Sequence, residues 1–244
     1  FSTNIPKEYN GFVRVDLPTG ENISLLTDNK NIKFKTVTGQ EFMNKLEVLE
    51  GNAQKEFNKV LAMQPLNEVQ NQVFPYLMQV YNQSDEFYQA IIKEQNRIKN
   101  LSNGTKFSGL VQYEKNLTDL KAEAQNAKDS NIIDQIVAHF VNDDVRLEQS
   151  GMFNDLVFAY INLKLSNGNQ QENIENKIIA ATDEILNKTK LTTSRGQNIL
   201  TALLNFVPKD QYPAFHKKYI DQAKALTGNV TDQLKKQIGQ TANV

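Results

Sequence analysis

The chain has 244 residues, enough for one large or two small domains, and its 39% hydrophobic and 23% charged content is that of a folded protein rather than a disordered one. Lys and Arg total 27 against 28 Asp and Glu, a net charge of -1, which argues against nucleic acid as a partner because phosphate backbones select basic surfaces. Cysteine is absent, which excludes thiol nucleophiles, disulfides and Cys-ligated metal sites.

The first residue of the chain and the length of its apolar runs indicate whether the protein is exported or spans a membrane. The chain begins with Phe1 rather than Met, so we expect a matured or excised product from which any export signal has been removed. No uninterrupted apolar run approaches the roughly 20 residues that a membrane-spanning helix needs. We therefore expect no membrane span.

The N-terminal residues predict β-strands. A short β-type run around Val13 precedes Leu17–Gly20, where the Pro and Gly positions favour a type I turn. A second run around Leu25 leads into a polar turn, and a third around Phe34 alternates apolar and polar residues, as a strand with one solvated face does. We expect an antiparallel meander within residues 1–40, packed on the helices or left over from a larger upstream sheet, with Leu46–Leu49 as a fourth strand or an extended lead-in.

Residues 41–244 have helical periodicity and form the second predicted domain. Apolar residues recur three and four positions apart on one side of each helix, which favours a mainly α fold: an irregular antiparallel bundle of amphipathic helices. Pro65 is expected to end one helix and Pro75 to kink the next. Segment 105–128 has the weakest pattern and fits either a helix or a polar linker. The clearer stripes are Leu66–Val80, Phe87–Leu101, Ile133–Phe140, Phe153–Tyr160, Ile174–Ile185, Ile199–Val207 and Tyr212–Leu226.

Two helical patterns meet within Asn131–Leu163 at an acidic turn, and His139 lies near the end of the first. Metal binding or general base catalysis would need the imidazole beside a carboxylate on the same helical face. Asp134 is rotated away from His139 on a helix, whereas Asp143 and Asp144 can approach it only through the turn. We interpret the cluster as structural, with the acids capping the next helix and His139 contacting a backbone carbonyl; an enzyme using His139 with Asp143 or Asp144 is the less favoured alternative.

A second candidate is the aromatic stripe Tyr212, Phe215 and Tyr219, which surrounds His216 and is flanked by lysines. Aromatic residues at helical spacing can line a pocket or stack on bases, but more often they belong to the core and the lysines form the solvated flank. We interpret the stripe as core, with a protein-contact surface as the alternative.

Recognisable catalytic and cofactor motifs are absent from the sequence. Neither a Gly-x-Gly-x-x-Gly nor a Walker phosphate loop occurs, and His-Glu-x-x-His and Gly-x-Ser-x-Gly are also missing. We therefore expect no catalytic residue, no metal, no cofactor and no enzymatic activity of the chain itself.

Four segments, in their order along the chain, carry a family resemblance: GFVRVDLPTGENISLLTDNKNIKFKT, LEVLEGNAQKEFNKVLAM, VYNQSDEFYQAIIKEQNRIK and IVAHFVNDDVRLEQSGMFNDLVFAYINL. Together they resemble the region upstream of the thioredoxin-like domain in exported thiol-disulfide oxidoreductases, which are periplasmic proteins or lipoproteins of Gram-negative bacteria. The sharpest part, HFVNDDVRLEQSGMFNDLVFAYI, is similar to a His-Phe-Phe, Asp-rich, Arg-Leu and hydrophobic-helix passage of that family. The resemblance spans Gly11 to Leu234.

In that family a β-rich domain is followed by a helical segment and then by a thioredoxin fold with Cys-x-x-Cys. We expect this chain to start near the end of the β-rich domain and to stop before the redox domain, and without cysteine no functional residue can be transferred. The resemblance implies a non-catalytic accessory module of the periplasm or cell envelope with protein partners: it would position the redox domain, dimerise or dock a client polypeptide. The alternative is a free-standing helical envelope protein that binds a peptide or small ligand.

Overall fold

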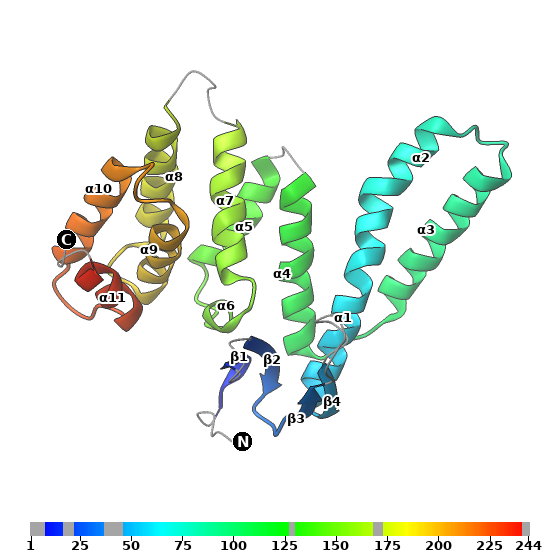
Figure 1. The fold of residues 1–244 in the computed structure, drawn as a ribbon, viewed down its shortest axis with the longest axis horizontal. Helices are drawn as coiled ribbons and strands as arrows, with labels where there is room; N and C mark the ends of the chain where they lie inside the picture. Colours follow the sequence, from blue (N-terminus) through cyan, green and yellow to red (C-terminus); the bar gives the residue numbers. More distant parts are fainter. Residues whose placement is uncertain (1–7, 17–21, 37–45, 127–129, 168–172, 241–244) are drawn as a thin grey trace. The chain divides into compact units, whose positions relative to one another are not determined.

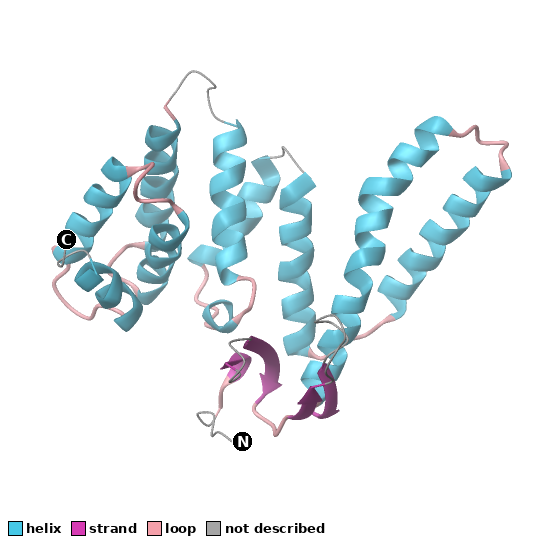
Figure 2. Cartoon of the chain, viewed as in Figure 1, coloured by secondary structure: helices cyan, strands magenta, loops and turns pink. Residues whose placement is uncertain are grey.

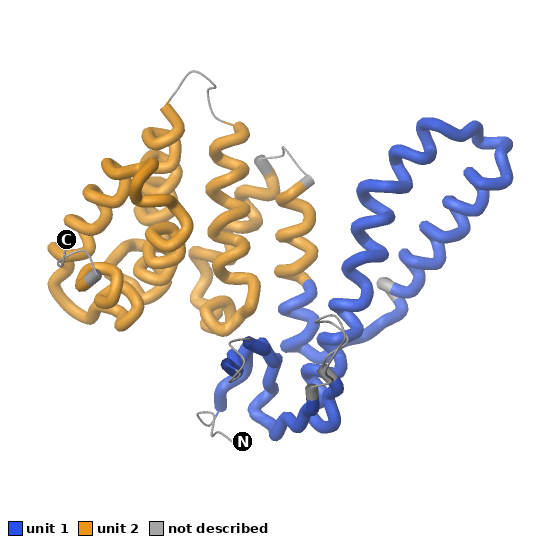
Figure 3. Tube along the Cα trace, in the orientation of Figure 1, with its two compact units in different colours: residues 1–115 blue, residues 116–244 orange. Residues whose placement is uncertain are grey.

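A computed structural model describes residues 8–16, 22–36, 46–126, 130–167 and 173–240 (Figure 1). The fold is mainly α with a small antiparallel β part at the N-terminus, as the sequence predicted (Figure 2). The chain divides into two compact units, Phe1–Lys115 and Asn116–Val244 (Figure 3). No helix among the described residues is long and apolar enough to cross a membrane.

Unit 1 contains the strands, a helical hairpin and the start of a further helix. Its elements are β1 (Asn10–Asp16), β2 (Asn22–Asp28), β3 (Lys33–Thr36), β4 (Leu46–Glu50), α1 (Asn52–Glu68), the π-helical turn η2 (Val69–Val73), α2 (Phe74–Val80), α3 (Glu86–Gly104) and the first part of α4 (Gly109–Asn126).

The strands pair in two separate hairpins. β1 and β2 are antiparallel with Val13 opposite Leu25, and β3 and β4 are antiparallel with an irregular register at Lys33 and Phe34. Among the described residues the strands therefore form two two-stranded sheets and not the predicted three-stranded meander. The possible fourth strand at Leu46–Leu49 is present as β4. The turn predicted at Leu17–Gly20 lies outside the described residues.

The core of unit 1 joins β2 to α1. Leu26 of β2 packs with Phe57 of α1 and Val111 of α4, and the Phe12 ring meets the Phe57 ring edge to face at 5.2 Å. The buried Gln54 side chain accepts a hydrogen bond from the Leu26 amide, which fixes α1 on the strand. Burial of these side chains is the main force that holds the β1–β2 hairpin on α1, because a two-stranded hairpin alone would be only marginally stable.

Gly51 makes the connection from β4 to α1 possible. Its φ is 119°, a backbone conformation that side chains disfavour, and a Cβ there would approach the Ile32 side chain to 3.3 Å. A glycine avoids both penalties. The chain can therefore leave the second hairpin and begin the helix within a single residue.

The hairpin of α1, η2, α2 and α3 (residues 52–104) is called the arm. α1 continues through Pro65 and passes without a break into η2, so the prediction that Pro65 ends the helix was wrong. A proline in a helix removes one backbone donor but need not stop a helix that packing holds in place. The local disturbance is the wide π turn just before Pro75, where the Phe74 amide donates to the Val69 carbonyl.

α3 runs back along α2 and closes the arm around a small core (Figure 1). Phe74, Ile91 and Ile98 are buried there, with Leu66 and Leu77 packed against them. The arm thus stabilises itself through one face of α2. A neighbouring side of α2 carries the exposed apolar side chains Tyr76 and Val80.

Unit 2 is an all-helical bundle. It contains the remainder of α4, then α5 (Ser130–Val141), α6 (Arg146–Gln149), α7 (Phe153–Asn167), α8 (Ile174–Thr189), α9 (Ser194–Phe206), α10 (Pro213–Lys224) and α11 (Asp232–Gln240). The segment with the weakest pattern, 105–128, is mostly the helix α4; residues 127 and 128 lie outside the described residues.

α7 and α9 lie at the centre of unit 2. The prediction that each helix needs partners on one flank only was wrong for both, since Ala159, Ile161 and Leu163 of α7 are buried in addition to the predicted stripe. α9 buries every side chain from Ile199 to Leu204. Both helices pack against each other and against α8, so that α8 is held on the central pair.

Candidate functional site

The predicted His-acid cluster lies where α5 meets the short helix α6. His139 is half-buried in the last turn of α5, whereas Asp134 and Asp143 are exposed. Asp144 is close enough for its charge to act on His139, but burial dominates and holds the His139 pKa below its usual value. The described residues contain no group of three metal-ligating side chains.

Asp144 is occupied by its own turn. Its Oδ1 accepts from the Arg146 backbone amide at 3.0 Å and from the Arg146 guanidinium at 2.9 Å, and Oδ2 accepts from Arg146 Nη2 at 2.6 Å. These hydrogen bonds, above all the side-chain one, lower the Asp144 pKa. The Asp144 carboxylate is therefore held by Arg146 in the turn that leads into α6.

Arg195, at the start of α9, is the residue that organises this corner, and the sequence analysis missed it. Nη1 donates to the backbone oxygens of His139 at 3.0 Å and Phe140 at 3.2 Å, and Nη2 donates to the Asp144 oxygen at 2.9 Å. Glu148 of α6 accepts from both Nε and Nη2. With 12% of its side chain exposed, Arg195 satisfies carbonyls that the end of α5 leaves without helical partners.

The aromatic stripe of α10 belongs to the core, as its spacing predicted. Phe215 and Tyr219 are fully buried, and Tyr212 is half-buried at the N-cap of α10. The Tyr219 hydroxyl donates to the Ile179 oxygen at 2.9 Å and lies 3.0 Å from Asp183 Oδ1. Burial is the main reason that the Tyr219 pKa lies well above its usual value.

His216 is also buried, with 7% of its surface exposed, and its Nε2 lies 2.6 Å from the Val207 carbonyl oxygen. A carbonyl can only accept, so this nitrogen carries the proton and donates. The ring thereby ties α10 to the end of α9. His216 is a structural residue that also lines a hollow on α10.

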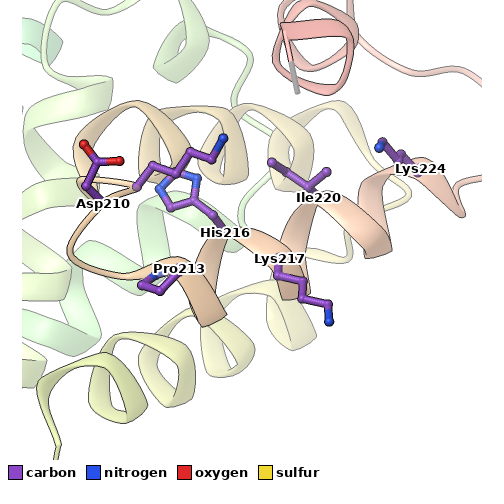
Figure 4. A pocket seen from close by; sticks show the side chains of 7 residues that line it. Asp210, Pro213, His216, Lys217, Ile220 and Lys224 are labelled. Carbon is purple, nitrogen blue, oxygen red and sulfur yellow. The ribbon is translucent and has the colours of Figure 1, made fainter. Parts of the chain in front are cut away.

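This shallow hollow, of about 520 Å³, lies along one face of α10 (Figure 4). Its floor is apolar and its rim carries three lysines against one aspartate, so its charge suits an anion. The residues that line it are Lys209, Asp210, Pro213, His216, Lys217, Ile220 and Lys224.

The arm carries the most conspicuous apolar surface of unit 1. Large apolar side chains that are at least one third exposed follow η2, α2 and the turn into α3, and we call them the arm surface: Val69, Val73, Tyr76, Val80, Tyr81 and Phe87. The Tyr81 and Phe87 rings meet edge to face at 4.9 Å, so the tip of the arm is ordered by an aromatic pair that is itself half exposed. The apolar repeat predicted Val69, Val73 and Val80 on the same stripe as Leu66 and Leu77, whereas the structure exposes the three valines and packs the two leucines against the core of the arm.

Comparison with protein family models, with curated proteins and with solved structures finds no match to this chain. The site assignment therefore depends on the geometry. In the described residues that geometry offers three features: a corner held by Arg195, a basic hollow on α10 and the arm surface.

Proposed function

We propose that this chain is a non-catalytic interaction module of a thioredoxin-like thiol-disulfide oxidoreductase of the cell envelope, which it serves by positioning the redox domain, by dimerising or by docking a client. The sequence resemblance supports the lineage. The observation that supports an interaction role is the arm surface, a contiguous set of exposed valine, tyrosine and phenylalanine side chains on a helical hairpin.

Binding by such a module would come from burial of surface and not from chemistry. Exposed aromatic and aliphatic side chains gain free energy when a partner removes them from water, and tyrosine is enriched at protein interfaces for this reason. Tyr76 is the most exposed of the set at 65%, so it has the most surface left to bury. It is the residue whose loss should weaken binding most.

The experiment uses the absence of cysteine. Because the chain has no thiol, it cannot itself reduce a disulfide, and any effect on a thioredoxin-like domain must come from binding. The domain to test is one encoded in the same reading frame or gene neighbourhood. We expect the chain to bind it in calorimetry and to change the KM for insulin reduction more than kcat.

Tyr76→Glu should weaken that binding, because it places a charge on the arm surface. The matched control is Tyr88→Glu, the same change at a half-buried tyrosine of α3 outside the arm surface, checked by circular dichroism for retention of the fold. No binding to the domain and no effect on its kinetics would contradict the accessory role.

The second candidate is a free-standing envelope protein that binds a small ligand, and the α10 hollow favours it. Its lysine rim would attract anions. If this function is correct, phosphate or citrate should raise the melting temperature of the chain, and Lys217→Gln with Lys224→Gln should remove the shift. A melting temperature that depends on ionic strength alone would contradict it.

A further inference from the structure

The stretch from Val69 to Ser84 contains no charged residue, although 23% of the chain is charged. It covers η2, α2 and the start of the turn that leads to α3. A solvent-facing helix normally carries Lys, Glu, Asp or Arg on its outer face, whereas the centres of protein interfaces are depleted of them. The composition of this stretch is therefore that of an interface, on a helix face that is open.

Four residues of the arm surface follow one another at intervals of four, three and four residues, and we call them the seam: Val69, Val73, Tyr76 and Val80. From Val73 to Val80 this is the spacing of helices that pack side by side as coiled coils, whereas the first interval crosses the wider π turn η2. The four residues are 36%, 45%, 65% and 60% exposed. The other apolar face of the same helix, with Phe74 and Leu77, is already used for the core of the arm.

The seam does not have the chemistry of a membrane-binding surface. Interfacial helices hold anionic headgroups with Lys and Arg beside their apolar face. Residues 69–84 contain neither, and the polar positions of the stretch are mostly Asn and Gln. An extended client peptide is also a poor fit, because strand addition needs the row of free backbone donors and acceptors that a sheet edge presents, and a helix face has no such row.

A second copy of the seam has the required properties. It is a helix face with the same repeat, so its side chains can enter the spaces of the first. In a two-fold contact the same patch meets itself, so a patch with a net charge would be repelled by its own copy. Here there is no charge to repel. Residues 69–84 are apolar or uncharged, which is unusual for an exposed helix but suits contact between two copies of the same surface.

The available area fits a modest dimer. Side chains of this size and exposure, with the aromatic pair at the tip of the arm, offer roughly 600 Å² per copy, against about 800 Å² per partner in a standard stable interface. We therefore expect an equilibrium that depends on protein concentration rather than a permanent dimer.

We propose that two copies of this chain associate through the seam, arm against arm, in a two-fold contact. The inference rests on the proposed function as an interaction module and develops its dimerising alternative, with a second copy of the chain as the partner of the arm surface. Equilibrium sedimentation of the full chain should show a monomer-dimer equilibrium. Val80→Glu should weaken dimerisation at least tenfold, because it buries a charge in an apolar contact.

The chain offers a matched control. Val145, which precedes α6 in unit 2, is 68% exposed compared with 60% for Val80, so Val145→Glu makes the same chemical change at similar exposure outside the seam. It should dimerise like the unmodified chain. A chain that stays monomeric across the concentration range, or a Val80→Glu variant that dimerises as well as Val145→Glu, would overturn the proposal.

Disulfide trapping tests the geometry independently, because the chain has no cysteine of its own. Val73 and Tyr76 lie at the middle of the seam. When the two seams run parallel, Val73 approaches its own symmetry mate, and when they run antiparallel it faces Tyr76 of the second copy. Val73→Cys alone, or its mixture with Tyr76→Cys, should form a linked dimer on mild oxidation, and Lys99→Cys, exposed on α3, should not. Equal trapping of Lys99→Cys would count against the seam.

The two proposals fail separately. A chain that is monomeric but binds the thioredoxin-like domain through Tyr76 would refute the seam dimer and leave the accessory role intact. A chain that dimerises through the seam but does not bind the redox domain would support the seam dimer and contradict the accessory role. Either result is read from the same purified protein.

Discussion

Arg195 stabilises the turn between α5 and α6 although it lies far from that turn in the sequence. The last carbonyls of α5 have no helical partner, and α6 begins only a few residues later. A planar guanidinium can donate in several directions at once and pair with Glu148 through two nitrogens. A lysine ammonium could reach one or two of these acceptors and would leave the others buried without a donor.

Arg195→Lys should therefore lower the free energy of unfolding by about 1 to 3 kcal/mol, because part of the hydrogen bonds to these backbone oxygens and to Glu148 are lost. Urea denaturation followed by circular dichroism measures it. Arg146→Lys is the control: its ion pair with Asp144 is in the same turn but is 45% exposed on the arginine side, and such pairs contribute about 0 to 1 kcal/mol. Equal effects of the two variants would show that the network around Arg195 carries no special stability.

Tyr219 makes stability sensitive to alkaline pH. Burial, followed by the hydrogen bond and charge of Asp183, raises its pKa above the value of about 10 that tyrosine has in an unfolded chain. The folded state thus keeps a proton that the unfolded state releases. Its stabilising effect is complete below about pH 10 and is lost as the pH rises from there toward the folded pKa.

Tyr219→Phe should flatten the loss of stability above about pH 10, because the variant has no proton to release. At neutral pH it should cost about 1 to 2 kcal/mol, since it removes the hydrogen bond to the Ile179 oxygen. Urea denaturation at a series of pH values tests both. A variant whose alkaline limb matches that of the unmodified chain would show that other groups control it.

At this scale the sequence identified the corner but not the residue that holds it. The apolar periodicity stops near His139 and resumes after the acidic turn, so the turn was predictable. Arg195 is more than fifty residues away along the chain from the carbonyls it serves, and no local pattern encodes that contact. The one available signal was the scarcity of arginine in a lysine-rich chain; the arginines are Arg14, Arg97, Arg146 and Arg195.

At the scale of elements, the strands and most helices could be predicted, because each carries an apolar repeat of its own. The apolar pattern of α4 is weak because the helix buries the polar residues Glu114 and Thr118, which a search for apolar repeats does not count. The continuation of α1 through Pro65 was missed because packing of Phe57, Val60 and Met63 outweighs the loss of one backbone donor. The pairing of the strands into two hairpins could not be predicted, because it depends on contacts between strands that the apolar pattern of each strand does not encode.

The start of α9 depends on a close approach of two backbones. Thr193 caps the helix by accepting from the Gly196 amide at 3.1 Å, and a Cβ on Gly196 would lie 2.3 Å from the Lys190 carbonyl oxygen. That oxygen belongs to the backbone and cannot simply rotate away. The glycine therefore permits the tight turn that places Arg195 at the corner.

Gly196→Ala should destabilise the protein by about 1 to 3 kcal/mol, as overpacking does elsewhere. Gly109→Ala, at the first residue of α4, is the control: a Cβ added there would meet nothing within 4 Å, and alanine favours the helix. The control should be neutral or more stable by up to about 1 kcal/mol in thermal unfolding. A neutral Gly196→Ala would mean that the α8–α9 turn can relax by several tenths of an ångström.

At the scale of the whole chain, each unit has its own core, and α4 belongs to both. Its first turns contribute Val111 to the cluster around Phe57, and beyond the division at Lys115 it buries Leu117 and Leu120. Structural units with separate cores can open separately, so a local loss of packing need not reach the other unit. The shared helix is the element through which such a loss would pass.

Phe57→Ala should test this. It removes a buried aromatic side chain from unit 1 and should cost about 3 to 5 kcal/mol there. Hydrogen exchange should then accelerate in α1, in β2 and in the first turns of α4, while amides of α7 and α9 keep their protection because their core is intact. Leu203→Ala, in the fully buried centre of α9, should give the reverse pattern. Faster exchange throughout the chain in either variant would show that the two cores unfold as one cooperative unit.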